Sequence, residues 1–139
     1  MKRYSYTTTT ALRPEQLYRA VSDINRWPEW DGELEATSHD GRLEPGSPFM
    51  LKPKGGPQVS MTIERAEEPS CFVDISHLPL AKMRTSHRFT AEPGGTRVDI
   101  GIEIWGPLAF LWDRIVARKL AAGAAAQTRA FFAHAETLR

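Results

Sequence analysis

Four consecutive stretches near the centre of the chain alternate between apolar and polar residues, and this alternation constrains the fold more than any other feature. The stretches cover residues 58–68, 71–78, 81–92 and 96–105. Strict alternation is typical of β-strands that bury one face and expose the other. Four such strands in succession predict an antiparallel sheet, and its apolar face must be covered by a second layer.

One helical segment is long enough to form that second layer. It begins at the Gly106-Pro107 pair, and its helical pattern continues to the end of the chain. Every other helical pattern in the sequence is much shorter. We therefore expect the sheet to curve around this C-terminal helix.

The chain before the alternating stretches predicts one strand, two short helices and further short strands. Residues 3–10 are aromatic and β-branched, which indicates a strand, and residues 14–23 predict a helix with Pro14 in its first turn. Residues 23–31 predict a second short helical element, and turn signals divide residues 32–57 into short strands. The expected class is α+β, with about seven antiparallel strands, two short helices after the first strand and the long C-terminal helix.

Length and composition predict a single domain over residues 1–139. With 41% hydrophobic and 25% charged residues and a net charge of +1, the chain has no global field that favours nucleic acid or an anionic membrane. The one cysteine, Cys71, cannot form an internal disulfide, which fits a reducing compartment. No apolar run is long enough to span a membrane. We expect a cytoplasmic protein without membrane insertion, and leave a homodimer open.

Several segments together resemble a known superfamily. They are PEQLYRAVSDINRWPEWDGEL, GRLEPGSPFML, HRFTAEPGGTRVDIGIEI and WGPLAFL. In this order they resemble the START-like (SRPBCC) superfamily, and within it the polyketide cyclase/dehydrase and lipid-transport group. The resemblance covers essentially the whole chain. It implies a helix-grip (START/Bet v 1-like) fold with an apolar cavity between the sheet and the C-terminal helix.

The resemblance implies a range of activities rather than one. Members of the superfamily bind lipids, sterols, polyketides or plant hormones; some cyclise or dehydrate polyketides, and others oxygenate aromatics or act as co-chaperones. A shared fold does not choose among these. Trp27 and Trp30 match the superfamily's W-x-x-W element, for which we expect a structural role. The arginines of the polyketide cyclase cavities have no match here, because Arg65 and Arg84 fall on the outward side of their predicted strands.

The centre of the C-terminal helix carries unusually small residues. Gly123 lies in a run of alanines, although a glycine in a helix costs about 1 kcal/mol relative to alanine. Either the small residues let the helix pack closely on the sheet, or they form the roof of a ligand cavity. The predicted water-facing side carries Arg114, Arg118, Arg129 and Glu136. The predicted inward side carries Trp112, Val116, Leu120, Gly123, Gln127, Ala130 and His134, with Phe131 and Leu138 at its edge.

The more apolar side of each strand is taken as the inward one. This criterion gives Phe49, Leu51, Val59, Met61, Ile63, Cys71, Val73, Ile75, His77, Met83, Thr85, His87, Phe89, Val98, Ile100, Ile102 and Ile104. The methionines suit an irregular ligand, but they also suit a close-packed core. The candidate ligand-contacting residues are Phe49, Met61, Met83, His87, Ile102, Trp112, Leu120, Gly123, Gln127, Ala130 and His134.

The two inward histidines are candidates for chemistry. If the turn after residue 78 pairs His77 with a residue near Met83, then His87 lies about four residues away, or roughly 13 Å. The two rings therefore cannot share a metal ion, and we expect neither a metal nor another cofactor. No nucleophile motif is present, so the candidate catalytic residues are His87 and His77 as general bases. A histidine on an apolar face is also a common core residue.

Three functions remain open from the sequence. The first is binding of a small hydrophobic molecule, such as a lipid, a polyketide or an aromatic metabolite, between the sheet and the C-terminal helix. The second is a polyketide cyclase/dehydratase type of enzyme that acts in the same place. The third, an interaction module, ranks last because the outward strand positions carry charged residues rather than a large apolar surface.

Overall fold

The sheet is a single antiparallel layer of seven strands. The structure, a computed structural model, describes residues 1–138. The strands are β1 (Lys2–Thr10), β2 (Leu34–His39), β3 (Pro48–Pro53), β4 (Val59–Glu67), β5 (Cys71–Leu78), β6 (Ala81–Glu92) and β7 (Gly95–Trp105). Their order across the sheet is β1-β7-β6-β5-β4-β3-β2, so every neighbour pair except β1–β7 is also consecutive in sequence.

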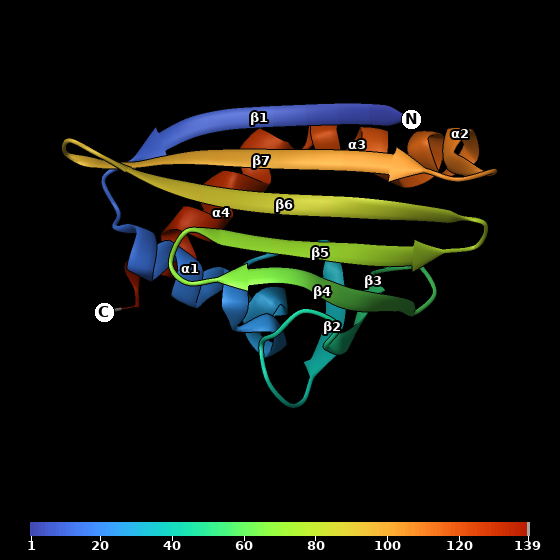
Figure 1. The fold of residues 1–139 in the computed structure, drawn as a ribbon, viewed down its shortest axis with the longest axis horizontal. Helices are drawn as coiled ribbons and strands as arrows, with labels where there is room; N and C mark the ends of the chain where they lie inside the picture. The colour runs from blue at the N-terminus through green and yellow to red at the C-terminus, as the bar shows by residue number, and fades with distance from the viewer. Residues whose placement is uncertain (139) are drawn as a thin grey trace.

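All helices lie on one side of this sheet, behind the strands in Figure 1. They are α1 (Pro14–Ser22), the 3-10 helix η1 (Ile24–Glu29), α2 (Ala109–Trp112), the π-helical turn η2 (Asp113–Ala117), α3 (Arg118–Ala122) and α4 (Ala124–Glu136). This arrangement confirms the expected α+β class, with a curved antiparallel sheet and a C-terminal helical layer. We call the helix-covered face of the sheet concave and the opposite face outer.

The short helices are anchored by contacts that their sequences explain. Pro14 begins α1, and the Gln16 side chain accepts a hydrogen bond from the backbone N–H of Arg13 at 3.1 Å, which caps the helix. Trp27 in η1 is buried, and its indole N–H donates to the Val21 carbonyl at 2.9 Å. The Trp27 ring packs edge-on against Phe49 at 5.5 Å. Through Trp27, these contacts hold α1 and η1 together and against β3.

The predicted face of β5 is wrong. A two-residue turn joins β5 to β6, so Leu78 pairs with Ala81 and His77 pairs with Lys82. The expected pairing differed by one residue, and a shift of one residue moves every side chain to the other face. The concave face of β5 therefore carries Phe72, Asp74 and Ser76, while the outer face carries Cys71, Val73, Ile75 and His77. Hydrophobicity could not distinguish these faces, because all residues from 71 to 76 are buried.

The predicted face of the C-terminal helix is off by one residue, although Trp112, Val116 and Leu120 pack against buried residues of the sheet as expected. The buried side consists of Asp113, Ala117, Ala124, Thr128, Phe131 and Ala135. Gly123 is exposed and separates α3 from α4, and its N–H donates to the Lys119 carbonyl at 3.0 Å. One residue corresponds to a rotation of about 100° around a helix. The apolar criterion failed because the true inward side includes the polar residues Asp113 and Thr128.

The core is divided into two apolar clusters. The larger one, which we call the α1 cluster, joins α1 and η1 to β2–β7 and includes Phe131 and Ala135 from α4. The smaller one, which we call the α2 cluster, is built on Met83, Ile102, Ile104 and Ala117. The two clusters share no residue. The centre of the concave face therefore lies between two apolar regions rather than within one.

Candidate functional site

Four polar side chains lie together on the concave face of β5 and β6. They are Asp74 and Ser76 on β5 and Thr85 and His87 on β6, and we call them the inner polar patch. Asp74 pairs directly with Thr85, Ser76 pairs with Met83, and Phe72 pairs with His87. Side chains in a direct cross-strand pair have Cβ atoms about 4.5–5.5 Å apart, and diagonal neighbours are still within reach of longer side chains. The four residues thus form one continuous surface.

The patch is shielded from solvent but makes few hydrogen bonds. Asp74 is 3% exposed and Ser76 is 5% exposed, while Thr85 and His87 are half-buried. Within residues 1–138, the side chains of Asp74, Ser76 and Thr85 have no hydrogen-bond or ion-pair partner. Buried polar groups are normally satisfied, because an unsatisfied one costs about 1–3 kcal/mol. Of the four residues, His87 alone has a fully buried polar atom without a partner, its Nδ1; the side-chain oxygens of Asp74, Ser76 and Thr85 are unpaired but not fully buried. Unpaired polar groups on a shielded face are typical of a ligand site.

Asp74 has the most perturbed electrostatics in the patch. Burial raises the pKa of its carboxyl group to about 7, and no neighbouring charge contributes to this shift. Its cross-strand neighbours on the concave face are Ile63 on β4 and Thr85 on β6. With no cation beside it, the carboxyl group is largely protonated below neutral pH.

His87 is shifted in the opposite direction. Burial lowers the pKa of its imidazole to about 4, and a backbone hydrogen bond with Phe72 opposes this shift. The ring lies 6.3 Å from the Phe131 ring of α4, and its Nδ1 atom is buried without a partner. His87 is therefore a neutral imidazole at physiological pH, and a weaker base than an ordinary histidine.

The α4 side of the same region also carries buried polar atoms without partners. Phe131 packs against Trp30 with ring centroids 5.1 Å apart, and the Trp30 indole nitrogen has no acceptor. On the turns that flank Phe131, Thr128 Oγ1 and His134 Nε2 are also unpaired. By contrast, the Gln127 amide donates to Asp31 at 2.7 Å and ties α4 to the loop after η1.

The predicted ligand-contacting residues are placed in four different surroundings. Phe49 and Met61 belong to the α1 cluster, whereas Met83 and Ile102, with Trp112 and Leu120 packed on them, belong to the α2 cluster. His87 lies in the inner polar patch. Gln127, Ala130 and His134 are half-buried on α4, and Gly123 is exposed. The expected inward position of Gly123 is wrong, for the reason given above.

The expected inward position of His77 is wrong as well. Its ring is exposed on the outer face and shares a 2.7 Å hydrogen bond with Thr62. There it borders an open depression of about 350 Å³ that Lys82 and Trp105 also line. A neighbouring depression of about 340 Å³ lies by the turn after β5. His77 lies on the outer face, beside these depressions, and His87 lies on the concave face. Because the sheet separates them, they cannot act together on one ligand.

Comparison with known proteins places the chain in a family. Residues 1–136 match the family described as polyketide cyclase/dehydrase and lipid transport. The chain belongs to this family. The match spans nearly the whole chain, in agreement with the resemblance found in the sequence. No curated protein matches the sequence.

Solved structures with the same fold have very different sequences. The di-domain ARO/CYC StfQ from the steffimycin biosynthetic pathway has a TM-score of 0.78 at 15% identity, covering 97% of this chain and 50% of that chain. Ara h 8.0201 has a TM-score of 0.76 at 13% identity, covering 98% of both chains. A START superfamily protein from Mycobacterium smegmatis has a TM-score of 0.72 at 18% identity, covering 99% of both. These similarities establish the Bet v 1/START-like fold.

Family and fold together fit a hydrophobic ligand-binding protein or a polyketide cyclase. Among residues 1–138, no three His, Cys, Asp or Glu side chains gather as a metal site would require. In the same part of the chain, no helix has both the length and the apolar character needed to cross a membrane. Arg84 on β6 lies on the outer face, where it binds Glu64.

Proposed function

We propose that this protein binds a small hydrophobic ligand between the concave face of the sheet and helices α3 and α4. The observation that carries the proposal is the inner polar patch, whose Asp74, Ser76 and Thr85 side chains are buried or half-buried without partners. A close-packed core gains nothing from such groups, and replacing them by apolar residues would stabilise it. Their presence is explained if a ligand supplies the missing hydrogen bonds.

The division of the core supports the same place for the ligand. The α1 and α2 clusters supply apolar walls on either side of the patch, and α3 and α4 supply small side chains above it. Ala121 is half-buried and Ala124 is 6% exposed, so neither fills much volume over the sheet. Ligand sites in proteins typically combine mostly apolar walls with a few converging polar groups.

A matched pair of alanine substitutions on α4 tests the proposal. Ala124 is buried toward the sheet, and Ala126, two residues further along the same helix, is exposed. Ala124→Phe should fill the proposed space and weaken binding of the neutral fluorescent probe N-phenyl-naphthylamine by about tenfold or more. Ala126→Phe should bind the probe like the unmodified protein. Fluorescence titration measures both.

The half-buried Ala130 provides a second variant, Ala130→Leu, in case Ala124→Phe fails to fold. Each variant is first checked by circular dichroism for native secondary structure. If the unmodified protein binds no apolar probe, or if probe affinity is the same in folded Ala124→Phe, folded Ala130→Leu and Ala126→Phe, the concave face is not the binding site.

A second candidate function, a polyketide cyclase/dehydratase type of enzyme, is favoured by Asp74. General acid–base catalysis is most effective when the pKa of the catalytic group lies near the working pH, and the pKa of Asp74 is about 7. The sequence-based candidates fit less well, since His77 faces outward and the pKa of His87 is about 4.

Enolisation of a simple ketone tests this second candidate without knowledge of the substrate. The Asp74 carboxylate would take a proton from the carbon next to the carbonyl of bound tetralone and return it to the same carbon. In deuterated water this cycle exchanges the proton for deuterium, which NMR detects. Exchange above the buffer rate that Asp74→Asn abolishes would support an enzyme; exchange at the buffer rate would leave the binding function alone.

A further inference from the structure

The surroundings of Asp74 limit the chemistry of the ligand that the concave face can hold. We infer that the Asp74 carboxyl group donates a hydrogen bond to a carbonyl or phenol oxygen of the ligand, so that the ligand is an uncharged, oxygen-bearing compound. This inference rests on the proposed function and names the class of its ligand. It goes beyond hydrophobic binding because it predicts which apolar molecules are preferred.

The first step of the argument is that Asp74 has no positively charged partner. The described titratable side chains on the elements around the concave face include His87 on β6, His134 on α4, Tyr4 and Tyr6 on β1, Tyr18 on α1, Asp113 on η2 and Asp31 after η1. Asp31 binds Gln127, and Asp113 accepts a hydrogen bond from Tyr4 at 2.7 Å and lies 3.5 Å from Arg118. Asp74 itself has no ion-pair partner within residues 1–138. An isolated buried carboxylate is very costly, so burial favours the protonated, neutral form.

The second step is the kind of hydrogen-bonding group that remains open. A protonated carboxyl group is a donor, and the unpaired Trp30 indole nitrogen can only donate. The hydroxyl groups of Ser76 and Thr85 can donate or accept. His87 Nδ1 is also unpaired, and a ring nitrogen of a neutral imidazole can accept. Asp74 and Trp30 still contribute donors, so a ligand that satisfies these groups must offer at least one acceptor. Carbonyl and phenol oxygens do so without bringing a charge into the apolar surroundings.

The third step compares a neutral ligand with a cationic one. An ammonium group would pair with ionised Asp74, but both charges would have to lose their water between two apolar clusters. The attraction inside a protein often fails to offset that loss. An ammonium group also offers three donors and no acceptor, so the Trp30 indole N–H would stay unsatisfied. The arrangement therefore favours a neutral ketone or phenol.

Two probes of similar size test the inference. Prodan is a neutral naphthyl ketone whose fluorescence responds to hydrogen bonding at its carbonyl, and N-phenyl-naphthylamine is an apolar probe without a carbonyl. We expect prodan affinity to fall about tenfold or more between about pH 6 and about pH 8.5, because Asp74 loses its donor proton over this range. The affinity for N-phenyl-naphthylamine should change much less.

Substitutions at Asp74 separate the donor from the charge. Asp74→Val removes both, so it should bind prodan about tenfold more weakly at about pH 6 while still binding N-phenyl-naphthylamine. Asp74→Asn keeps a donor that does not ionise, so it should bind prodan with little dependence on pH. Asp99→Asn is the matched control, because Asp99 lies on the outer face of β7 where it accepts a hydrogen bond from Thr7. It should behave like the unmodified protein.

The outcomes distinguish this inference from the proposed function. If N-phenyl-naphthylamine binding is blocked by Ala124→Phe but prodan affinity is unaffected by pH and by Asp74→Val, the ligand site stands and the role of Asp74 is refuted. If naphthylmethylammonium binds more tightly as the pH rises and prodan does not weaken, the patch is a cation site and the inference is overturned. If neither probe binds to the concave face, the proposed function itself fails.

Discussion

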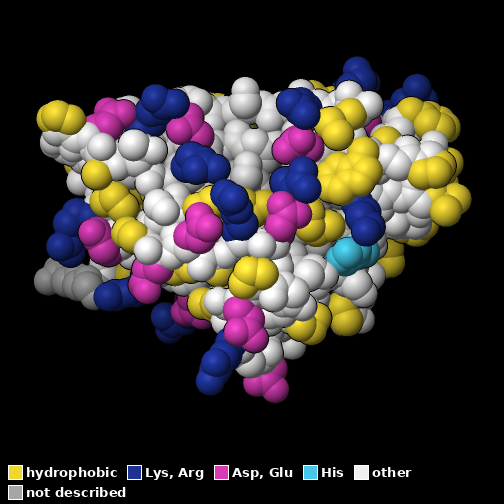
Figure 2. All heavy atoms as spheres, in the orientation of Figure 1, with side chains coloured by type: hydrophobic (Ala, Val, Ile, Leu, Met, Phe, Trp, Pro, Cys, Tyr) yellow, Lys and Arg dark blue, Asp and Glu magenta, His cyan; other side chains and the backbone are white. Residues whose placement is uncertain are grey.

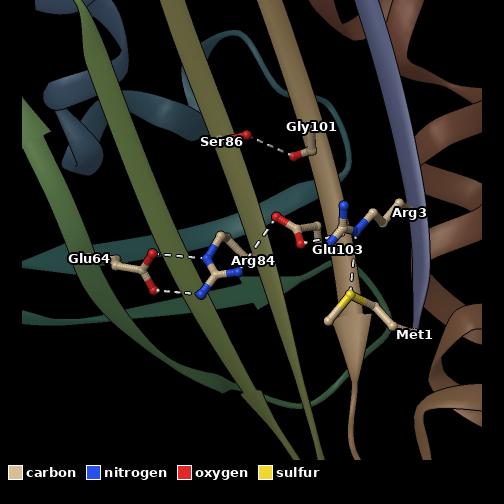
Figure 3. Close-up of polar contacts among 7 residues, drawn as sticks. All are labelled: Met1, Arg3, Glu64, Arg84, Ser86, Gly101 and Glu103. Atoms are coloured by element: carbon tan, nitrogen blue, oxygen red, sulfur yellow. Dashed lines mark hydrogen bonds and ion pairs between the residues drawn. The ribbon is translucent and has the colours of Figure 1, made fainter.

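Polar side chains are paired on the outer face of the sheet and unpaired in the inner polar patch on the concave face. On the outer face, Arg84 forms two hydrogen bonds with Glu64, at 2.9 and 3.2 Å, and a longer one of 3.5 Å with Glu103 (Figure 3). Its guanidinium also lies 4.9 Å from the centre of the Trp105 ring. Basic and acidic side chains are interspersed across the centre of this face (Figure 2). On the concave face, one strand position away, Asp74 and Thr85 have no partner.

The difference lies in hydrogen-bond partners, which the polar groups of the outer face have and those of the inner polar patch lack. Polar side chains that serve the fold are paired with each other or with water, as Arg84 and Glu64 are. Polar side chains that are buried without a partner destabilise the empty protein, and they persist where function requires them. In this protein the absence of partners, rather than polarity alone, distinguishes the inner polar patch from the outer face.

The largest expected effect on stability is at Asp74, because burial strongly favours its protonated form over its ionised form. The pKa rises from 3.8 in the unfolded chain to about 7 in the native protein, so the native state binds more protons between these values. The contribution of Asp74 to stability is present below pH 3.8 and is lost as the pH rises through 7. A difference of about 3 pH units corresponds to roughly 4 kcal/mol. Asp74→Asn should raise the free energy of unfolding by up to that amount at about pH 8.

Urea denaturation of the two proteins at about pH 4 and about pH 8 measures this prediction. Near the lower pH the substitution should change the free energy of unfolding little, because Asp74 is then neutral in the native protein. Equal effects of Asp74→Asn at both pH values would mean that the native carboxyl group titrates normally, and the contrast between the two faces would be lost.

The next effect is the opposite pH dependence of His87. Its pKa falls from 6.5 to about 4 on folding, so the native state binds fewer protons in that window. The contribution of His87 to stability is roughly 3 kcal/mol. It is present above pH 6.5 and is lost as the pH falls through about 4. Between these pH values the opposite effects of Asp74 and His87 on stability largely cancel in the unmodified protein. His87→Gln should therefore reveal stability that falls with rising pH, and Asp74→Asn stability that rises.

A pair of threonines sharpens the comparison between satisfied and unsatisfied hydroxyl groups. Thr128 is 2% exposed and its Oγ1 has no partner, whereas Thr96 is 1% exposed and donates to the Leu12 carbonyl at 2.7 Å. Valine has nearly the same shape as threonine. Thr128→Val should stabilise the protein by about 1 kcal/mol and Thr96→Val should destabilise it by a similar amount. Thermal denaturation shifts of the same sign in both variants would contradict this.

The smallest effect is expected on the outer face. The side chains of Arg84 and Glu64 are 30% and 38% exposed, so water and salt screen their attraction. Glu64→Gln should lower the free energy of unfolding by about 0.5 kcal/mol, and the loss should shrink at high salt. A loss of several kcal/mol would show that the outer network is as important to the fold as the buried residues are.

Much of the fold could be predicted from sequence because it depends on patterns that extend over many residues. Alternation in the stretch that became β7 placed Val98, Ile102 and Ile104 on the buried face, where the structure has them. The length of the C-terminal helical pattern identified the covering layer. The water-facing residues Arg114 and Arg118 are exposed as expected.

The site could not be predicted in the same way, and the reason is physical. The more apolar side was taken as the inward side, but Asp74 and Ser76 make the inward side of β5 the more polar one. Asp113 and Thr128 have the same effect on the C-terminal helix. An apolar criterion therefore errs wherever polar groups lie inside, whether they are paired, as Asp113 is, or unpaired, as Thr128 is. The better signal was the length of the turn between β5 and β6, since a two-residue turn fixes which residues pair.

The division of the core into two clusters has a consequence for how such proteins diversify. Phe131 with α1 anchors one end of the helical layer, and Ala117 with Met83 and Ile104 anchors the other. Between the anchors, Ala121 and Ala124 bury little side-chain volume against the sheet. Exchange of those residues can change what the protein recognises while the scaffold survives. Folds as similar as those of this chain and Ara h 8.0201 can accordingly persist at 13% identity.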